Sequence, residues 1–233
     1  MSRLRVATYN VHKCRGMDWR VNPARILKVI EEIDADVIAL QEVFAKQALY
    51  LSEHLRVPQV FGSARRLIAD EYGNAVFSRY PVLQTCDYDL SVKRREPRRC
   101  LRVDVCLPEN RFFHLFAVHL GTSYFERRHQ AVKLLSEEIL GQKELKAPRI
   151  LIGDFNEWTR GLVTQTLSEH MKSADLRHHL GRSRTYPGVA PFLHLDHVYY
   201  DRPLELVNMR LHRTPAALIA SDHLPLVADF EWR

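Results

Sequence analysis

The sequence predicts an α/β fold, a four-layer α/β/β/α sandwich of two stacked mixed, mainly antiparallel sheets with helices outside. Three observations predict it. The chain opens with a strand, a helix and a second strand, and two further groups of strand-like segments follow in the middle and at the end. Helix-like segments separate these groups. A sheet buries an apolar face and a helix buries an apolar stripe against a neighbouring element. A mixture of strands and helices therefore packs as layers around a hydrophobic core.

The opening of the chain carries the first strand, helix and strand. Residues 4–10 are strand-like, and Asn22-Pro23 marks a helix start, with Asn as the N-cap and Pro at the first helical position. The helix then has an apolar stripe at helical spacing, made of Ile26, Leu27, Ile30 and Ile33. Residues 36–42 form a short apolar run that ends in polar residues, which is typical of a buried strand.

The rest of the chain alternates strands and helices. Strands are predicted at 74–79, 82–90, 100–107, 111–119, 149–153, 193–200, 204–212 and 224–231, and helices at 125–140 and 162–169. Pro108-Glu109-Asn110 is a turn signal that predicts a hairpin between the third and fourth of these strands. Antiparallel pairing is therefore expected in the middle of the chain and in its tail.

Size and composition indicate one folded unit. The chain has 233 residues, 46% hydrophobic and 27% charged, with no repeat and no linker-like segment, so residues 1–233 are treated as a single domain. No apolar run approaches the roughly 20 residues of a membrane-spanning helix. The N-terminus lacks an export signal, and four well-separated cysteines match no zinc spacing. Reduced thiols and a cytoplasmic location are expected.

The charge balance favours anionic partners. A net charge of +6 and a pI near 9.2 suit nucleic acid, phospholipid headgroups or phosphorylated small molecules. A basic solvated surface explains such a modest excess equally well. Five of the basic residues lie in the run 93–99, where a polyanion-binding site and a solvated hairpin tip both stay open.

Polar side chains recur where apolar strands end. Asn10 follows the first strand, Glu42 the second, and Asp154 and Asn156 follow the strand at 149–153. A rigid sheet can hold such side chains while the adjoining loops keep them accessible. Their joint recurrence therefore predicts a functional site at the ends of the strands.

A carboxylate and an imidazole stand together near the end of the chain. Ser221-Asp222-His223 precedes a strand, and Asp196 lies in another strand, where a buried carboxylate needs a partner. An imidazole is the natural one. A zinc site built from His194, Asp196 and His197 is disfavoured, because strand alternation sends the last two to opposite faces. Signature motifs of kinases, dehydrogenases, zincins and serine hydrolases do not occur in the sequence.

Taken in order, these segments resemble the motif series of the endonuclease/exonuclease/phosphatase superfamily, which includes DNase I, AP endonucleases, deadenylases, neutral sphingomyelinases and inositol polyphosphate 5-phosphatases. The series reads Thr8-Tyr9-Asn10, Leu40-Gln41-Glu42, Gly73-Asn74-Ala75, Val118-His119-Leu120, Gly153-Asp154-Phe155-Asn156, Leu195-Asp196-His197 and Ser221-Asp222-His223. It covers residues 8–223. Single motifs are unspecific, but seven in this order make a strong signal.

The resemblance implies a metal site and a water-activating carboxylate. Glu42 would be the principal ligand, with Asn10 and Asp222 beside it, an oxygen set suited to Mg²⁺ or Mn²⁺. Asp154 would orient or deprotonate the attacking water. Asn156 would donate hydrogen bonds to the phosphate.

The resemblance also implies two imidazoles in the chemistry. His223 would act in acid/base or phosphate-stabilising work, held in one tautomer by Asp196. His119 would protonate the leaving oxygen or bind phosphate, and Asn74 would line the substrate site. Whether Asp154 or His223 takes the proton of the water stays open.

The implied activity is that of a divalent-metal-dependent phosphoester hydrolase, in the first place a phosphodiesterase or nuclease, by in-line attack of water on phosphorus. A phospholipid or sphingomyelinase-type phosphodiesterase, or a phosphatase, is the first alternative, and a nonhydrolytic phosphate- or nucleic-acid-binding module the second. Substrates would be nucleic acid, lipid headgroups or small phosphoesters, and no obligate protein partner is inferred. Val11-His12 stands where AP endonucleases carry an acidic ligand, which argues against abasic-site incision.

Overall fold

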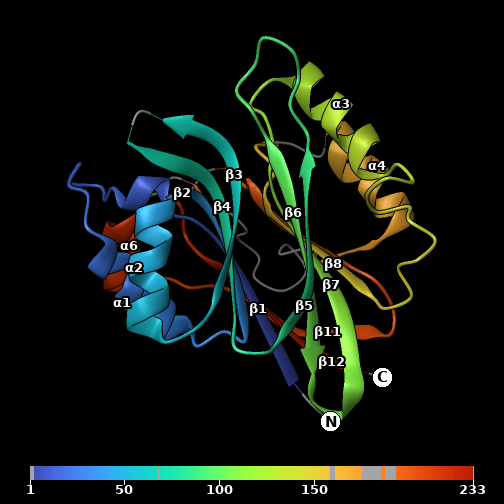
Figure 1. Cartoon of the computed structure of the whole chain (residues 1–233), viewed down its shortest axis with the longest axis horizontal. Coiled ribbons are helices and arrows are strands. Elements are labelled where there is room, and N and C mark those ends of the chain that lie inside the picture. Colours follow the sequence, from blue (N-terminus) through green and yellow to red (C-terminus); the bar gives the residue numbers. More distant parts are fainter. Residues whose placement is uncertain (1–2, 68, 158–160, 175–184, 187–192, 233) are drawn as a thin grey trace.

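Two stacked sheets form the centre of the protein. The computed structural model describes residues 3–67, 69–157, 161–174, 185–186 and 193–232. Each sheet has six strands, and helices cover the outer face of each sheet (Figure 1). The predicted layered sandwich is confirmed.

The first sheet has the strand order β11-β12-β1-β2-β4-β3. Its strands are β1 (Arg3–Asn10), β2 (Val37–Phe44), β3 (Gln59–Leu67), β4 (Asp70–Ser78), β11 (Leu204–Leu211) and β12 (Leu226–Trp232). β1 and β2 run parallel, as a strand, helix, strand opening requires, and the other neighbours are antiparallel.

The second sheet has the order β5-β6-β7-β8-β10-β9. Its strands are β5 (Val82–Asp89), β6 (Arg99–Leu107), β7 (Arg111–His119), β8 (Arg149–Asp154), β10 (Asp196–Tyr200) and β9 (Lys172–Ser173). β7 and β8 run parallel and the other pairs are antiparallel, including the predicted β6–β7 hairpin. Each sheet therefore has one parallel pair in its interior.

The helices lie on opposite sides of the two sheets (Figure 1). α1 (Pro23–Ile33), α2 (Ala45–Leu55) and α6 (Pro215–Ala220) pack on the first sheet, and α3 (Tyr124–Leu134) and α4 (Leu162–His170) pack on the second. Two 3₁₀ turns, η1 (His12–Cys14) and η2 (Pro108–Asn110), complete these elements. As predicted, the Asn22 side chain caps α1, accepting from the backbone N–H of Ala24 at 3.1 Å.

Strand alternation decides which side chains enter the space between the sheets. In β1, Leu4 and Val6 face the second sheet, whereas Ala7 and Tyr9 face the helices. The same alternation carries Asn10, at the end of β1, to the intersheet side. In β8 it carries Asp154 there in the same way, after Ile150 and Ile152. The apolar layer between the sheets thus turns polar at one edge.

The predicted helix at 125–140 is too long. α3 ends at Leu134, because the Ser136 hydroxyl donates to the carbonyl of Lys133 at 2.7 Å and competes with the helical backbone pattern. The N–H of Leu140 instead reaches back to the carbonyl of Leu134. Ile139 and Leu140 are still buried under the second sheet. The apolar spacing therefore predicted burial correctly and backbone conformation wrongly.

Besides η1 and the two-residue strand β9, three elements have no counterpart in the sequence prediction. α2 buries only Ala48 and Leu51, so its apolar stripe is weak. β3 is an edge strand that carries the charged pair Arg65-Arg66, and α6 is a single short turn of helix between β11 and β12. Two strand boundaries also differ by more than two residues. β4 begins at Asp70 instead of residue 74, and β10 begins at Asp196 instead of 193, with 187–192 outside the described residues.

The described residues include no helix that is both long and apolar enough to span a bilayer. Cys14, Cys86, Cys100 and Cys106 are all free thiols, as expected from their spacing.

Candidate active site

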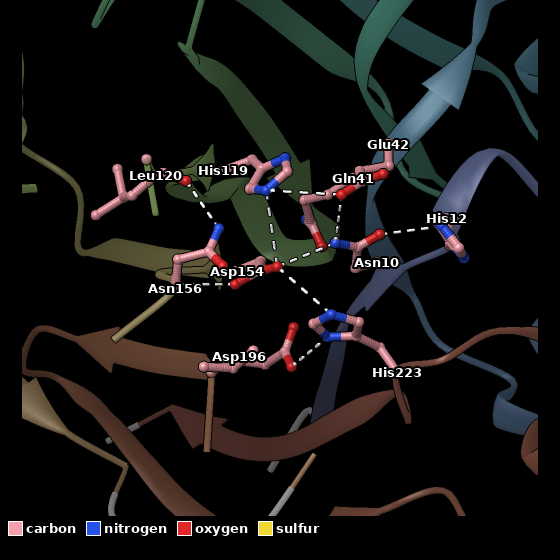
Figure 2. Close-up of polar contacts among 12 residues, drawn as sticks. Asn10, His12, Gln41, Glu42, His119, Leu120, Asp154, Asn156, Asp196 and His223 are labelled. Atoms are coloured by element: carbon pink, nitrogen blue, oxygen red, sulfur yellow. Dashed lines mark hydrogen bonds and ion pairs between the residues drawn. The ribbon is translucent and has the colours of Figure 1, made fainter. Parts of the chain in front are cut away.

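The predicted site residues come from strand ends that meet at one edge of the sandwich. β1, β2, β7 and β8 end at this edge, and the antiparallel neighbours β10 and β12 begin there. In the second sheet, Asp154 is the register partner of both His119 and Asp196. Figure 2 shows that these side chains and those of Asn10 and Glu42 point toward one another. Sheet register, and not sequence proximity, brings the motifs together.

Asn10 links the two sheets. Its side-chain Nδ2 donates to Asp154 Oδ2 at 3.0 Å and to Glu42 Oε1 at 3.3 Å, while its Oδ1 accepts from the backbone N–H of His12 at 3.0 Å. The Ser221 hydroxyl donates to the Asn10 carbonyl at 2.8 Å. The segment that precedes β12 is thereby fixed against the end of β1.

His223 and Asp196 form a second link between the sheets. His223 Nδ1 lies 3.1 Å from Asp196 Oδ2, and His223 Nε2 lies 3.7 Å from Asp154 Oδ2 (Figure 2). Burial alone would lower the pKa of His223, but the charge and hydrogen bond of Asp196, with Asp154, raise it to about 10. The imidazole therefore carries a proton. Among the described residues, Asp196 Oδ1 is buried without a hydrogen-bond partner.

Asp154 lies at the centre of the cluster. It is 1% exposed, and burial together with the neighbouring Asp196 raises its pKa to about 6, although His223 and Asn10 act in the opposite direction. Gly153, with φ 147°, brings the strand this close to β7, since a Cβ on it would lie 1.9 Å from the carbonyl oxygen of Val118. A carboxylate with a raised pKa suits proton transfer near neutral pH.

Asn156 supports Asp154 from the following loop. Its backbone N–H donates to Asp154 Oδ1 at 2.8 Å, and its Nδ2 donates to the carbonyl of Leu120 at 2.9 Å. Its φ of 50° lies in the left-handed region, which asparagine tolerates better than most residues. The predicted contact with phosphate would use the second N–H of the same amide.

Glu42 stands at a distorted point of β2. A register shift between Leu40 and Val43 leaves Glu42 with φ 56°, a left-handed conformation that glutamate rarely adopts. Burial would raise the pKa of its carboxyl, but His119, the Asn10 amide, Lys13 and the hydroxyl of Tyr72 outweigh burial and lower it to about 2. Glu42 is therefore ionised across the working pH range.

His119 is buried at the end of β7. Its Nε2 lies 3.7 Å from Asp154 Oδ2 and 3.9 Å from Glu42 Oε1. Burial and the adjacent Arg98 guanidinium lower the pKa of His119 to about 3, so the ring is neutral. A neutral imidazole donates a hydrogen bond through its N–H group but is too weak an acid to give up that proton near neutral pH. Of the two predicted roles, this arrangement favours phosphate binding over protonation of the leaving oxygen.

Two predicted residues lie at the margin of this central cluster. Asp222 is partly exposed, and its Oδ2 lies 3.6 Å from His12 Nδ1. Asn74 is buried and donates to the carbonyl of Arg99 at 3.5 Å. The metal role of Asp222 and the substrate role of Asn74 stay predictions.

Three residues that reach the cluster were not predicted individually. Tyr72 hydrogen-bonds Glu42, Lys13 lies 5.6 Å from the centroid of the Tyr72 ring, and Arg98 contacts His119 at 2.9 Å. Two of them had a signal. Tyr72 is two residues before Asn74 and thus on the same strand face, and Arg98 lies in the basic run 93–99, for which a polyanion-binding site was one of two open interpretations. Lys13 lies in a turn without periodicity.

The donor set fits a hard divalent cation. Asp154, Asp196 and His223 place ligand atoms within 4.8 Å of one another and could hold an ion. Because His223 is protonated and bonded to Asp196, however, the ionised Glu42 is the better ligand. The Asn10 amide N–H group, which lies between the carboxylates of Glu42 and Asp154, marks a point where positive charge is favoured. Mg²⁺ commonly uses one or two carboxylates and completes its shell with water and substrate oxygens.

Fold and site together define a class of phosphoester hydrolase, and sequence comparison gives the family. The chain belongs to the Endonuclease/Exonuclease/phosphatase family, whose family model matches residues 7–223. Members of this family hydrolyse phosphoesters and are generally dependent on divalent metal ions. The family predicted from the motif series is confirmed.

Individual relatives match nearly the whole chain. The uncharacterized protein YbhP of Escherichia coli K12 is 28% identical over 245 residues, which cover 97% of this chain and 95% of YbhP. A functionally unknown conserved protein from Enterococcus faecalis V583 has a structure with TM-score 0.86 at 21% identity, covering 99% of this chain and 100% of that one. The human Nocturnin catalytic domain with bound sulfate gives TM-score 0.80 at 20% identity, covering 99% and 95%. At these identities the structural matches establish the fold.

Proposed function

We propose that this protein is a Mg²⁺- or Mn²⁺-dependent phosphodiesterase in which water attacks phosphorus in line with the leaving oxygen. One observation carries the proposal. The buried Asp154, with its raised pKa, lies within 3.7 Å of a protonated His223 and shares the Asn10 amide with an ionised Glu42. A proton acceptor, a proton donor and a metal-binding carboxylate are thus side by side.

The metal ion would be held by Glu42, with Asn10 and Asp222 as further oxygen ligands. When bound, such an ion polarises a phosphoryl oxygen and offsets charge on the leaving oxygen. The ionised state of Glu42 supports its role, because a carboxylate ligand must be deprotonated to bind.

Asp154 and His223 carry out separate proton transfers in this proposal. Asp154 orients the water and accepts its proton, a role that is supported by the protonated state of His223. His223 donates to the phosphoryl group or the leaving oxygen, and Asp196 keeps it charged and oriented. His119 and the amide of Asn156 donate hydrogen bonds to phosphoryl oxygens.

A diester with further phosphates, as in DNA or RNA, is the favoured substrate. The loop between β5 and β6 exposes Lys93, Arg94 and Arg95, and the chain carries a net charge of +6. Positive charge next to a phosphoester site favours a polyanion. A phospholipid diester and a phosphomonoester are the alternatives. Each would be identified by hydrolysis of the corresponding compound in a substrate panel.

The direct test is a substrate panel with and without EDTA. DNA, RNA, phospholipid vesicles, small diesters and monoesters are incubated with the protein and Mg²⁺ or Mn²⁺. We expect diester cleavage that EDTA abolishes and added Mg²⁺ or Mn²⁺ restores. Cleavage of a nucleic acid should weaken steeply with added salt.

Glu42→Gln is the matched variant, since it keeps the side-chain shape and removes the charge. It should need a metal concentration about 10- to 100-fold higher for half-maximal activity. Metal-independent turnover, or binding of phosphoesters with no turnover on the panel, would reject the proposal in favour of a different mechanism or a nonhydrolytic binding module.

A further inference from the structure

Arg98 is a buried cation that adjoins His119 and has no contact with substrate in the proposed mechanism. Its side chain comes from the loop before β6, and the residue is only 7% exposed. Nη2 donates to Glu96 at 3.0 Å, and Nη1 lies 2.9 Å and 3.2 Å from the two ring nitrogens of His119. Nε has no hydrogen-bond partner among the described residues. A guanidinium, with five N–H donors, is here only partly used.

The charge of Arg98 is incompletely balanced. Glu96 is its acidic partner, but the same carboxylate also pairs with Arg65 at 3.1 Å and is itself 38% exposed. Two guanidiniums therefore share one carboxylate. A buried charge is costly unless it is paired, so this arrangement favours an additional anion.

The contact with His119 leaves Nη1 available. The lone-pair directions of the two imidazole nitrogens diverge in the ring plane, so one donor cannot lie along both. A nitrogen close to both ring atoms lies against the face of the ring. Nη1 therefore makes no strong in-plane hydrogen bond to His119 and retains N–H groups to donate. These groups lie next to the ring whose Nε2 faces Asp154 and Glu42.

We propose that Arg98 is an anion-binding residue that takes a phosphoryl oxygen of the substrate through Nη1, beside His119. Guanidinium groups match phosphate in charge and geometry better than any other side chain. Lys93, Arg94 and Arg95 are exposed on the same loop and extend positive charge outward from this point. The inference rests on the proposed function for the identity of the anion, a phosphoester.

The test measures binding of inorganic phosphate to the full chain by calorimetry, in EDTA-treated protein and in protein with Mn²⁺. Arg98→Gln should weaken phosphate binding at least tenfold and raise KM for a phosphodiester with a smaller change in kcat. Arg98→Lys should restore part of the binding. Arg99→Gln is the matched control, because this neighbouring arginine pairs with Asp87 at 3.0 Å, and it should leave binding unchanged.

Three outcomes would overturn the inference. One is a folded Arg98→Gln protein that binds phosphate as the parent does, another is an equal loss in Arg99→Gln, and the third is a parent protein that binds no phosphate in either form. Circular dichroism and the melting temperature establish folding. If the parent binds phosphate through Arg98 but hydrolyses nothing on the panel, the proposed function fails and this inference stands. If the parent hydrolyses diesters and Arg98→Gln changes neither KM nor phosphate binding, this inference fails and the proposed function stands.

Discussion

Two aspartates of this protein are equally buried and differ in almost everything else. Asp154 is 1% exposed and Asp229, in β12, is 0% exposed. The pKa of Asp154 is raised to about 6, whereas that of Asp229 is lowered. Burial raises the pKa of both carboxyls, and at Asp229 the neighbouring donors outweigh it.

The neighbours of Asp229 are all donors. Arg3 reaches it at 2.6 Å, Arg5 at 2.7 Å, Asn208 at 3.2 Å and Arg210 at 3.3 Å. Asp154 instead has another carboxylate, Asp196, on its own sheet. A carboxylate whose negative charge is paired with arginines stabilises the fold. A buried carboxylate whose ionised form is disfavoured can accept a proton and is therefore suited to catalysis.

One strand connects the two environments. β1 carries Arg3 and Arg5 at its beginning, where they fix Asp229, and Asn10 at its end, where it joins Asp154 to Glu42. We therefore expect replacement of aspartate by asparagine to have different consequences at the two ends of β1. At Asp154 it should reduce turnover, and at Asp229 it should reduce stability.

The largest effect is expected for Asp154→Asn. Loss of the water-positioning carboxylate should reduce kcat about 10³-fold. Because a raised pKa makes the charged form unfavourable in the folded state, its penalty develops as pH rises from the unfolded value of 3.8 to about 6 and is complete above that, so the variant should unfold at the same or a higher temperature at pH 7.5. Turnover assays and thermal unfolding check this. Parent-like activity would remove Asp154 from the mechanism.

Asp196→Asn should have the next largest effect, about 100-fold on kcat. Asp196 is the main group that raises the pKa of His223, so this pKa should fall from about 10 and the alkaline limb of activity should move to lower pH. NMR titration of His223 in metal-free protein measures the shift directly. Asp34→Asn, at a surface carboxylate that pairs with Arg79, is the control. An unmoved titration in Asp196→Asn would break the proposed dyad.

Asp229→Asn should leave turnover unchanged and lower the free energy of unfolding by about 2 kcal/mol, a value kept small because Arg3, Arg5 and Arg210 are partly exposed. The pKa of Asp229 is lowered on folding, so its contribution is present above the unfolded value of 3.8 and disappears as pH falls below it. Urea unfolding of both proteins at pH 7 and pH 3 tests this, and the difference should be smaller at pH 3. A difference as large at pH 3 as at pH 7 would show that the charge is not its source.

Arg210→Gln should have the smallest effect, below about 1 kcal/mol. Its guanidinium is the most distant of the three from Asp229, at 3.3 Å, and is 31% exposed. Arg3 and Arg5 still satisfy the carboxylate. Urea unfolding would detect a larger loss, and such a loss would mean that all three arginines are needed.

The sequence predicted the layers better than their boundaries. Strands with strong alternation or continuous apolar runs, such as β1 and β7, were located within one residue. α2 and β3 were missed because their packing depends on distant partners, and their own apolar patterns are weak. Ser136 ended a helix that hydrophobic spacing alone would have continued.

The candidate site was predictable where its residues end apolar strands. Asn10, Glu42 and Asp154 meet that description, and the structure brings them together. Arg98 was not predictable as a site residue, because its position depends on a loop that folds against β7. Nor was the neutral state of His119, since the guanidinium that lowers its pKa is 21 positions away in the sequence.

The left-handed backbone of Glu42 has a consequence for laboratory evolution. Glycine occupies that conformation without steric cost, whereas a side-chain-bearing residue loses on the order of 1 kcal/mol or more. A library of variants screened only for resistance to heat should therefore enrich glycine at position 42. The most heat-resistant variants from such a screen would lack the carboxylate of Glu42 and with it the proposed activity.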